Sequence, residues 1–218
     1  MNPAKVLDKG WGIAGAKLEP LGSGHINETL LVTGSRPVVL QRINEQVFTD
    51  PEQVMRNLAR VQAHLADTAP DLIPPLIEAQ DGQDFVQDEE GGYWRLWGYV
   101  PDGMTIEQTR DPAVCRVAAE AFGRFQQLLS DLPGPLLEPT IPGFLELAGY
   151  LDRFDSVAAT AAAAEQAIAE ACGGADGIDA YRGLALELEK GDTLIHGDCK
   201  LNNLLFNKSG TAVRAVLD

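Results

Sequence analysis

The chain has 218 residues, of which 45% are hydrophobic and 22% are charged, and this composition is typical of a folded protein with one large domain or two small lobes. Its formal net charge of −15, from 17 basic and 32 acidic residues, argues against nucleic acid or an anionic membrane as the main partner. The charge leaves nucleotide binding open, because Mg²⁺ and backbone N–H groups can hold phosphates in an acidic protein.

The sequence lacks the usual signals for export or membrane insertion. No apolar run approaches the roughly 18 residues that a membrane span needs, and residues 1–12 lack the apolar core of a signal peptide. The three cysteines, Cys115, Cys172 and Cys199, form an odd and unclustered set that fits a reducing compartment and no metal site. We therefore expect a cytoplasmic protein without a membrane partner.

The first hundred residues have the pattern of an antiparallel sheet with one helix. We expect residues 1–12 to be a peripheral lead-in. The alternation of apolar residues then predicts the main strands, at residues 16–21, 28–33, 38–43 and 93–100. A glycine turn at residues 22–27 separates the first two strands, and its glycines would permit close backbone approach to a phosphate. Taken alone, this turn is more typical of an ordinary hairpin.

One helix is predicted within this β-rich part, at residues 51–66. Asp50, Pro51 and Glu52 supply an N-cap, a proline in the first turn and an acid at the positive end of the helix dipole. Apolar residues then follow at helical spacing, namely Val54, Leu58, Val61 and Leu65.

The composition changes after residue 100. From there to residue 193 the patterns are mainly helical, with helices predicted at residues 113–129, 144–172 and 178–189. We therefore place a lobe boundary here, with an N-lobe at residues 1–100 and a C-lobe at residues 101–218.

A polar loop at residues 196–203 carries the residues with the clearest chemical potential. Asp198 is a loop carboxylate that can accept the proton of a hydroxyl group. Asn203 follows five residues later. A hairpin with a turn at residues 207–210 comes next, and Asp218 ends its second strand, so Asn203 and Asp218 can both reach one Mg²⁺. This layout predicts a phosphotransfer site.

The loop has the pattern H-x-D-x-K-x-x-N, and it resembles the catalytic loop of the protein-kinase-like superfamily. Gly197, where protein kinases have Arg, is similar to the aminoglycoside phosphotransferase and choline kinase branch. Further segments resemble the N-acetylhexosamine 1-kinases within that branch, at residues 22–27, 40–44, 47–48, 93–96 and 198–203. The resemblance implies an α+β, protein-kinase-like two-lobed fold with an antiparallel β N-lobe and a mainly helical C-lobe. It also implies that the C-lobe is incomplete here, because relatives continue with further helices.

The resemblance also implies roles for individual residues. Asp198 would be the catalytic base, Lys200 would reach the γ-phosphate, and Asn203 with Asp218 would hold Mg²⁺. The remaining nucleotide contacts would come from the glycine turn and the interlobe hinge, namely Gly22, Ser23, Gly24, Tyr99 and Val100. The strand at residues 38–43 lacks the expected lysine, so Gln41 or Arg42 must serve, and strand alternation lets only one of them face the nucleotide.

The implied activity is ATP- and Mg²⁺-dependent phosphotransfer to a small-molecule hydroxyl. An N-acetylhexosamine, phosphorylated at its anomeric hydroxyl, is the first expectation for the acceptor. Leu145 stands where those sugar kinases have a histidine. An aminoglycoside, choline or another amino-alcohol is therefore an alternative within the family. A nucleotide-binding remnant without turnover is the alternative of a different class.

Overall fold

The computed structural model describes residues 2–22, 26–160, 162, 165–167, 170, 182–183 and 193–217. It contains two compact units, one formed by Met1–Ile141 with Leu194–Asp218 and the other by Pro142–Thr193. The lobe boundary predicted after residue 100 stays a prediction. Within the described residues, no helix combines the length and the apolar character needed to cross a membrane.

The first unit contains a five-stranded antiparallel sheet in the order β1-β2-β3-β5-β4. Its strands are β1 (Lys17–Pro20), β2 (Glu28–Thr33), β3 (Val38–Arg42), β4 (Val86–Gln87) and β5 (Tyr93–Gly98). Leu40 pairs with Leu30 on one side and with Leu96 on the other, so these three side chains lie on one face of the sheet. The four main strands predicted from the sequence are confirmed.

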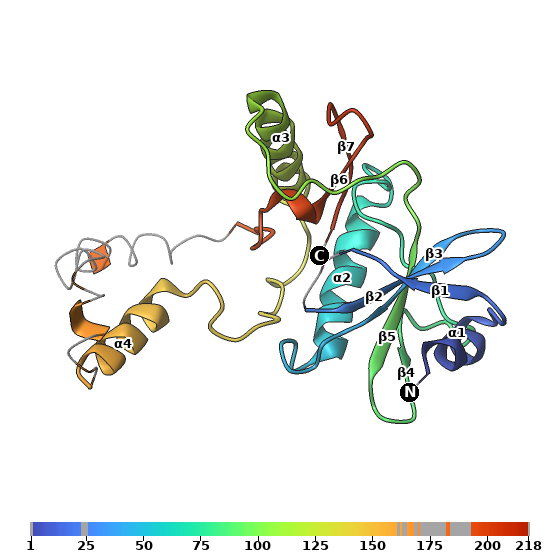
Figure 1. Ribbon diagram of the computed structural model, residues 1–218, viewed down its shortest axis with the longest axis horizontal. Helices are drawn as coiled ribbons and strands as arrows, with labels where there is room; N and C mark the ends of the chain where they lie inside the picture. Colours follow the sequence, from blue (N-terminus) through green and yellow to red (C-terminus); the bar gives the residue numbers. More distant parts are fainter. Residues whose placement is uncertain are drawn as a thin grey trace. The chain divides into compact units, whose positions relative to one another are not determined.

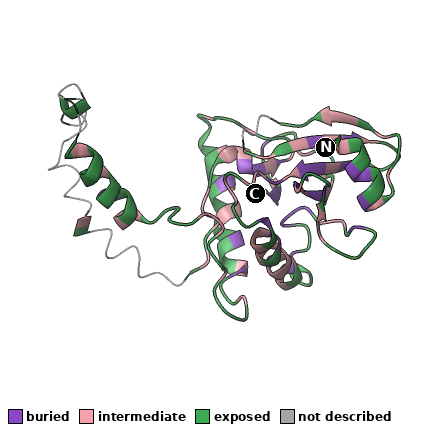
Figure 2. Cartoon of the chain, turned by 90° about the horizontal axis from the view of Figure 1, so that it is seen from below, coloured by how far each residue is buried: buried purple, intermediate pink, exposed green. Residues whose placement is uncertain are grey.

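Helix α1 (Pro3–Trp11) packs on this apolar face, so the predicted peripheral lead-in is wrong. The Asn2 side chain accepts a hydrogen bond from the N–H of Ala4 at 2.9 Å, and Gly12 ends the helix with a φ of +67°. Val6 and Leu7 are 2% and 1% exposed, and they pack in one cluster with the apolar residues of the sheet. Figure 2 shows buried residues along one side of this helix and exposed residues along the other. The residues that mark the start of this helix, Asn2 as the N-cap and Pro3 in the first turn, could be recognised in the sequence.

Helix α2 (Pro51–Leu65) lies on the other face of the sheet (Figure 1). Asp50 caps it by accepting a hydrogen bond from the N–H of Gln53 at 2.9 Å, as predicted. In its first turn, Glu52 accepts a hydrogen bond from the Tyr93 hydroxyl of β5 at 3.2 Å. Its C-terminal half contributes Val61 and Leu65 to a second hydrophobic cluster.

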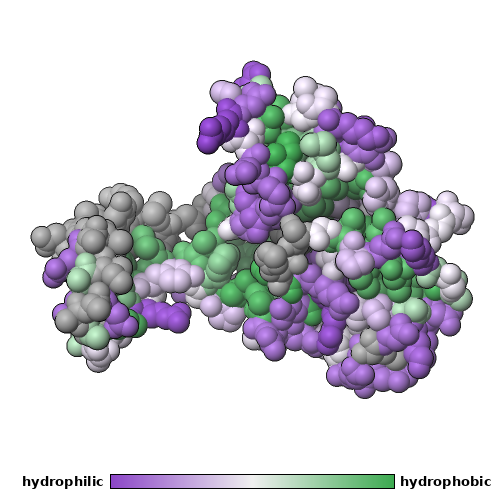
Figure 3. Space-filling view, viewed as in Figure 1, coloured by the Kyte–Doolittle hydropathy of each residue, from purple (hydrophilic) through white to green (hydrophobic). Residues whose placement is uncertain are grey.

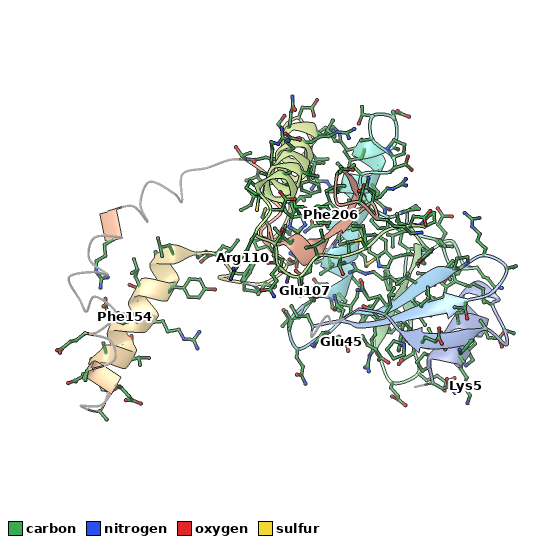
Figure 4. All side chains as sticks on the ribbon, turned by 45° about the horizontal axis from the view of Figure 1, so that its top comes forward. Lys5, Glu45, Glu107, Arg110, Phe154 and Phe206 are labelled. Atoms are coloured by element: carbon green, nitrogen blue, oxygen red, sulfur yellow. The ribbon has the colours of Figure 1, made fainter. Side chains whose placement is uncertain are left out.

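This second cluster supports the predicted polar loop. It joins α2 to α3 (Pro112–Leu128) and to the hairpin of β6 (Leu204–Phe206) and β7 (Val213–Val216). Phe206 has no exposed surface, and Figure 4 shows it pointing in among the surrounding side chains. In the space-filling view of Figure 3, hydrophilic side chains cover much of the rim of this unit, with hydrophobic ones between them. The helix at residues 113–129 and the hairpin turn at residues 207–210 are confirmed.

The second unit contains α4 (Leu147–Ala158), in which Leu151 is buried. Arg182 forms an ion pair with Asp155 at 2.6 Å. Of the helix predicted at residues 144–172, the described part is helical at α4 and at residues 165–167, whereas residues 144–146 and 159–160 are not helical. The helix predicted at residues 178–189 lies almost entirely outside the described residues.

Candidate active site

The predicted catalytic loop makes a tight turn between two apolar segments. Gly197 has a φ of +84°, a backbone conformation that residues with a side chain rarely adopt. The turn closes with a hydrogen bond from the N–H of Lys200 to the carbonyl of Asp198 at 2.8 Å. The short 3₁₀ helix η1 (Leu201–Asn203) then leads directly into β6. The backbone therefore fixes the Asp198 side chain close to the buried hairpin.

His196 connects this loop to the end of the hairpin. Its Nδ1 accepts a hydrogen bond from the N–H of Asp198 at 3.3 Å. The proton must then lie on Nε2, which donates to the carbonyl of Leu217 at 2.8 Å. The ring also makes edge-on contacts with Phe122 and Phe125, with centroids 5.1 and 5.5 Å away. His196 thus fixes the position of Asp198 through the backbone N–H of that residue and ties the loop to the end of the hairpin.

Asp198 is held by two donors on the same carboxylate oxygen. Lys200 Nζ lies 2.6 Å from Asp198 Oδ2. Asn203 Nδ2 donates to the same oxygen at 2.9 Å and to the carbonyl of Asp198 at 3.0 Å. Within the described chain no donor reaches the other oxygen, Oδ1, so this atom is available to accept a proton from a bound hydroxyl group.

These contacts also set the ionisation of Asp198. Partial burial raises its pKa, but the hydrogen bonds from Lys200 and Asn203 and the charge of Lys200 outweigh this effect. The pKa of the Asp198 carboxyl therefore lies below its ordinary value, and the group is ionised at neutral pH. A proton acceptor in this position is ready to act without first losing a proton of its own.

Asn203 is a predicted metal ligand, and the loop holds its side chain in place. The side chain is 3% exposed, and its hydrogen bonds to Asp198 use Nδ2, so Oδ1 is the atom that could bind a cation. The N–H of Leu217 donates to the carbonyl of Asn203 at 2.8 Å, so the residue before Asp218 lies against Asn203. Asp218 itself lies outside the described residues. Amide and carboxylate oxygens are hard donors of the kind that Mg²⁺ prefers.

In the described residues, no group of three or more acidic, histidine or cysteine side chains could hold a metal ion. Carboxylates elsewhere in the described chain therefore do not add ligands to Asn203. A cation here would therefore take its remaining ligands from Asp218, water and the nucleotide phosphates. The residues present fit a magnesium ion that is bound together with its nucleotide.

The glycine turn is only partly described. Gly22 has a φ of +79°, and nothing lies within 4 Å of the position that a Cβ would take. Ser23 and Gly24 lie outside the described residues. At the far end of the turn, Asn27 Oδ1 accepts a hydrogen bond from the N–H of Asn44 at 3.0 Å, and Asn44 Nδ2 donates to the carbonyl of Ile26 at 3.0 Å. Sequence reasoning gave these two asparagines no role.

The structure separates Gln41 from Arg42, as strand alternation predicts. Gln41 is 8% exposed and lies on the sheet face toward α2. Arg42 lies on the other face, 5.9 Å from the centroid of the Trp94 ring. Its guanidinium lies 3.6 Å from Glu45, which Figure 4 shows close to the end of the sheet.

The predicted hinge residues follow directly after β5. The N–H of Gly98 donates to the carbonyl of Pro75 at 2.8 Å, which fixes the start of this segment. Tyr99 is 38% exposed and Val100 is half-buried. An exposed aromatic ring beside a fixed backbone is compatible with a flat ligand, and the adenine contact remains a prediction.

The comparisons with known proteins agree with this geometry. A family model described as the phosphotransferase enzyme family, APH, matches residues 17–218. The chain belongs to this phosphotransferase family. The membership predicted from the loop is thereby confirmed, whereas a particular closeness to the N-acetylhexosamine 1-kinases is not shown.

Solved structures with the same fold include several small-molecule kinases. A spectinomycin phosphotransferase in complex with ADP and spectinomycin has a TM-score of 0.58 and 13% identity, over 99% of this chain and 67% of that one. An amicoumacin kinase in complex with AMP-PNP and Ca²⁺ has a TM-score of 0.61 and 13% identity, over 98% and 61%. A microcompartment-associated aminopropanol kinase has a TM-score of 0.61 and 18% identity, over 99% and 67%.

These similarities confirm the α+β kinase-like fold that the sequence predicted. The chain spans 61 to 67% of the length of those three chains. Two helices, α1 and α2, lie within its first hundred residues instead of the single predicted helix.

Proposed function

We propose that the protein transfers the γ-phosphoryl group of ATP to a hydroxyl group of a small molecule in a Mg²⁺-dependent reaction. The observation that carries this proposal is the arrangement around Asp198, where Lys200 and Asn203 bind one carboxylate oxygen and leave the other free to accept a proton. Membership of the phosphotransferase family supports the same reaction.

Each polar residue of the loop would have its own role in the reaction. Asp198 Oδ1 would hold the acceptor hydroxyl in line with the γ-phosphate and would take its proton as the new O–P bond forms. Lys200 is half-exposed, so its ammonium group could turn from Asp198 toward the charge that develops on the γ-phosphate. Asn203 and Asp218 would hold Mg²⁺, which when bound would neutralise charge on the β- and γ-phosphates.

The nucleotide would lie under the glycine turn of Gly22, Ser23 and Gly24, with its adenine beside Tyr99 and Val100. Asn44 supports this placement, because its hydrogen bonds fix the end of the turn. The solved structures of similar fold contain ADP or AMP-PNP, which agrees with a nucleotide site in this fold.

For the acceptor we propose an N-acetylhexosamine, phosphorylated at its anomeric hydroxyl. The support is the similarity of the segments at residues 22–27, 40–44 and 198–203 to the N-acetylhexosamine 1-kinases. An amino-alcohol or an aminoglycoside is the second candidate, because the similar solved structures include an aminopropanol kinase and a spectinomycin phosphotransferase. The cytoplasmic location remains a prediction from the sequence.

The test is a screen of acceptors with the protein expressed from its complete reading frame. The protein should release ADP from ATP and Mg²⁺ in the presence of N-acetylglucosamine, and glucose, 1-amino-2-propanol, choline and spectinomycin serve as the comparison set. Asp198→Asn should lower kcat by about 10²–10⁴-fold, because the amide retains the shape of the side chain but cannot accept the proton.

Three results would change the proposal. ADP release with one of the other acceptors would replace the N-acetylhexosamine and keep the reaction class. Unchanged turnover in Asp198→Asn would remove Asp198 as the base. Nucleotide binding without ADP release for any hydroxylated compound would favour a binding protein without turnover.

A further inference from the structure

We propose that residues 131–139 form a strap that locks helix α2, and that Arg60 and Asn57 are the positioning residues of this lock. Through α2, the strap would hold the end of β7, next to the predicted metal ligand Asp218. The inference rests on the proposed function, since it concerns the placement of that ligand. Both positioning residues would act only through other groups and would take no part in the chemistry.

The strap lies along a polar face of α2. The side chains of this face recur at helical spacing, and they are Gln53, Asn57, Arg60 and His64. In the first turn of the helix, Gln53 Nε2 donates to the carbonyl of Pro139 at 2.9 Å. In the last turn, His64 Nε2 lies 3.1 Å from Asp131 Oδ1. The strap therefore runs antiparallel to α2 and follows it over most of its length.

Arg60 binds the strap at a sharp turn. Its Nη2 donates to the carbonyl of Pro135 at 2.7 Å and to the carbonyl of Pro133 at 3.0 Å. Hydrogen bonds from a charged donor are roughly twice as strong as those between neutral groups. Gly134 between the two prolines has a φ of +96°, and a Cβ there would lie 3.3 Å from Arg60 Nη2. The turn that brings both carbonyls to one nitrogen thus depends on glycine.

Asn57 holds the strap through both polar atoms of its side chain. Nδ2 donates to the carbonyl of Glu138 at 2.7 Å, and Oδ1 accepts a hydrogen bond from the N–H of the same residue at 3.3 Å. This pair of bonds resembles the pairing of two backbone segments in a sheet. Asn57 therefore fixes the orientation of the strap as well as its distance from α2.

The strap itself is stiff and is also bound through apolar contacts. The rings of Pro133, Pro135 and Pro139 fix φ at three positions. Leu132 and Leu137 pack against the second hydrophobic cluster, to which α2 contributes as well. A stiff segment loses little conformational entropy when it is bound, so these contacts can hold the strap and the helix as one body.

Another side of α2 is connected to the end of the catalytic hairpin. Gln62 Nε2 donates to the carbonyl of Pro74 at 2.9 Å. Two residues earlier in that segment, the carbonyl of Leu72 accepts a hydrogen bond from the N–H of Val216 at 2.7 Å. Val216 ends β7 and precedes Asp218 by two residues. A shift of α2 would therefore shift the group that holds the end of β7, from which the chain leads directly to the predicted metal ligand.

The experiment combines hydrogen–deuterium exchange, which needs no ligand, with the Mg²⁺ dependence of ADP release, and it uses the protein expressed from its complete reading frame. Arg60→Met is the main variant, because it removes the charge and the donors but keeps a linear side chain. Arg56→Met is the matched control one helical turn earlier, where the arginine forms exposed ion pairs with Asp50 and Glu138 at 3.5 and 3.8 Å. Thermal unfolding verifies that each variant is folded.

Arg60→Met should speed the exchange of the α2 amides by about 10- to 100-fold, the change that corresponds to losing a hydrogen bond from a charged group. The peptide that contains β7 should exchange faster as well. The Mg²⁺ concentration for half-maximal ADP release should rise by about 10-fold, the lower end of the effect of residues that support a metal ligand. Adenosine binding should not change.

Three further variants test the two sides of the contact. Asn57→Ala on α2 and Gly134→Ala on the strap should change the exchange of α2 and β7 and the Mg²⁺ dependence in the same direction as Arg60→Met. Arg60→Lys should recover part of the effect, because an ammonium group can still donate to one of the carbonyls. Arg56→Met should behave as the unchanged protein does.

Equal α2 exchange in Arg60→Met and Arg56→Met would show that the strap does not lock the helix, and it would overturn the inference. Faster exchange of α2 alone, with unchanged β7 exchange and unchanged Mg²⁺ dependence, would reduce the strap to a structural tie and overturn the positioning role. If the unchanged protein released no ADP with any acceptor, the proposed function would fail, and the exchange of β7 would still decide whether the strap positions the hairpin.

Discussion

The Lys200→Met substitution separates the proposed catalytic role of Lys200 from any structural one. Lys200 Nζ lies 2.6 Å from Asp198 Oδ2, and the two side chains are 48% and 47% exposed. Methionine keeps most of the length and apolar character of the lysine side chain and removes only the charge. The change therefore tests what the ammonium group contributes.

The expected effects on stability and on turnover differ widely. A half-exposed ion pair is screened by water and is worth about 0.2–1 kcal/mol, so the free energy of unfolding should fall by no more than about 1 kcal/mol. Removal of a cation that stabilises charge on the γ-phosphate in the transition state should lower kcat by about 10²–10³-fold, or about 3–4 kcal/mol. A large kinetic effect with a small effect on stability is thus the expected signature.

The substitution should also change the pH dependence of the reaction. Lys200 lowers the pKa of Asp198 through its hydrogen bond and its charge, so the pKa should rise in the variant. As the proposed base, Asp198 would act in its ionised form, so the acid limb of the kcat/KM profile should move to higher pH. A carboxyl group whose pKa is lower in the folded than in the unfolded protein stabilises the fold at pH values above the unfolded-state pKa. This stabilisation is lost as the pH falls through the folded-state pKa. In the variant the folded-state pKa of Asp198 is higher, so Asp198 contributes less of this stabilisation and less is lost on acidification.

The assay is steady-state ADP release with the acceptor that the screen identifies, combined with urea unfolding. Lys208→Met is the matched control, because Lys208 pairs with Asp102 on an exposed part of the hairpin turn. The control should keep its kcat. Unchanged kcat in Lys200→Met, or an equal loss in Lys208→Met, would refute the reasoning.

Two further predictions concern the packing of the sheet and are measured by urea unfolding. Leu7→Ala should lower the free energy of unfolding by about 2–5 kcal/mol, because Leu7 is 1% exposed between α1 and the sheet, whereas the exposed control Asp8→Ala should change it by less than about 0.5 kcal/mol. Equal stability of these two variants would show that α1 is not part of the core. Trp94→Phe should cost about 1–3 kcal/mol, because Trp94 Nε1 donates to the buried Asp88 carboxylate at 2.8 Å, and Trp97→Phe is the half-buried comparison. A larger loss in Trp97→Phe would contradict the importance of that hydrogen bond.

Local signals in the sequence located most of the secondary structure correctly. Asp50 and Pro51 marked the start of α2, and the turn at residues 207–210 marked the hairpin, because capping and turn formation depend on neighbours along the chain. The same kind of signal existed at Asn2 and Pro3, where a short helix was nevertheless missed. Its apolar side is only a few residues long, so its packing against the sheet could not be inferred from periodicity.

The sequence by itself determined the family and the chemistry of the loop, because Asp198, Lys200 and Asn203 lie within six residues and interact through one turn of backbone. It also determined that Gln41 and Arg42 lie on opposite faces of a strand. Only the tertiary structure decided which of those faces α2 covers, because burial depends on elements that are distant in the sequence. The strand register then placed Arg95 beside Gln41, 54 positions away along the chain. Pairing at that distance leaves no trace in the local pattern, because the two residues become neighbours only when their strands pair.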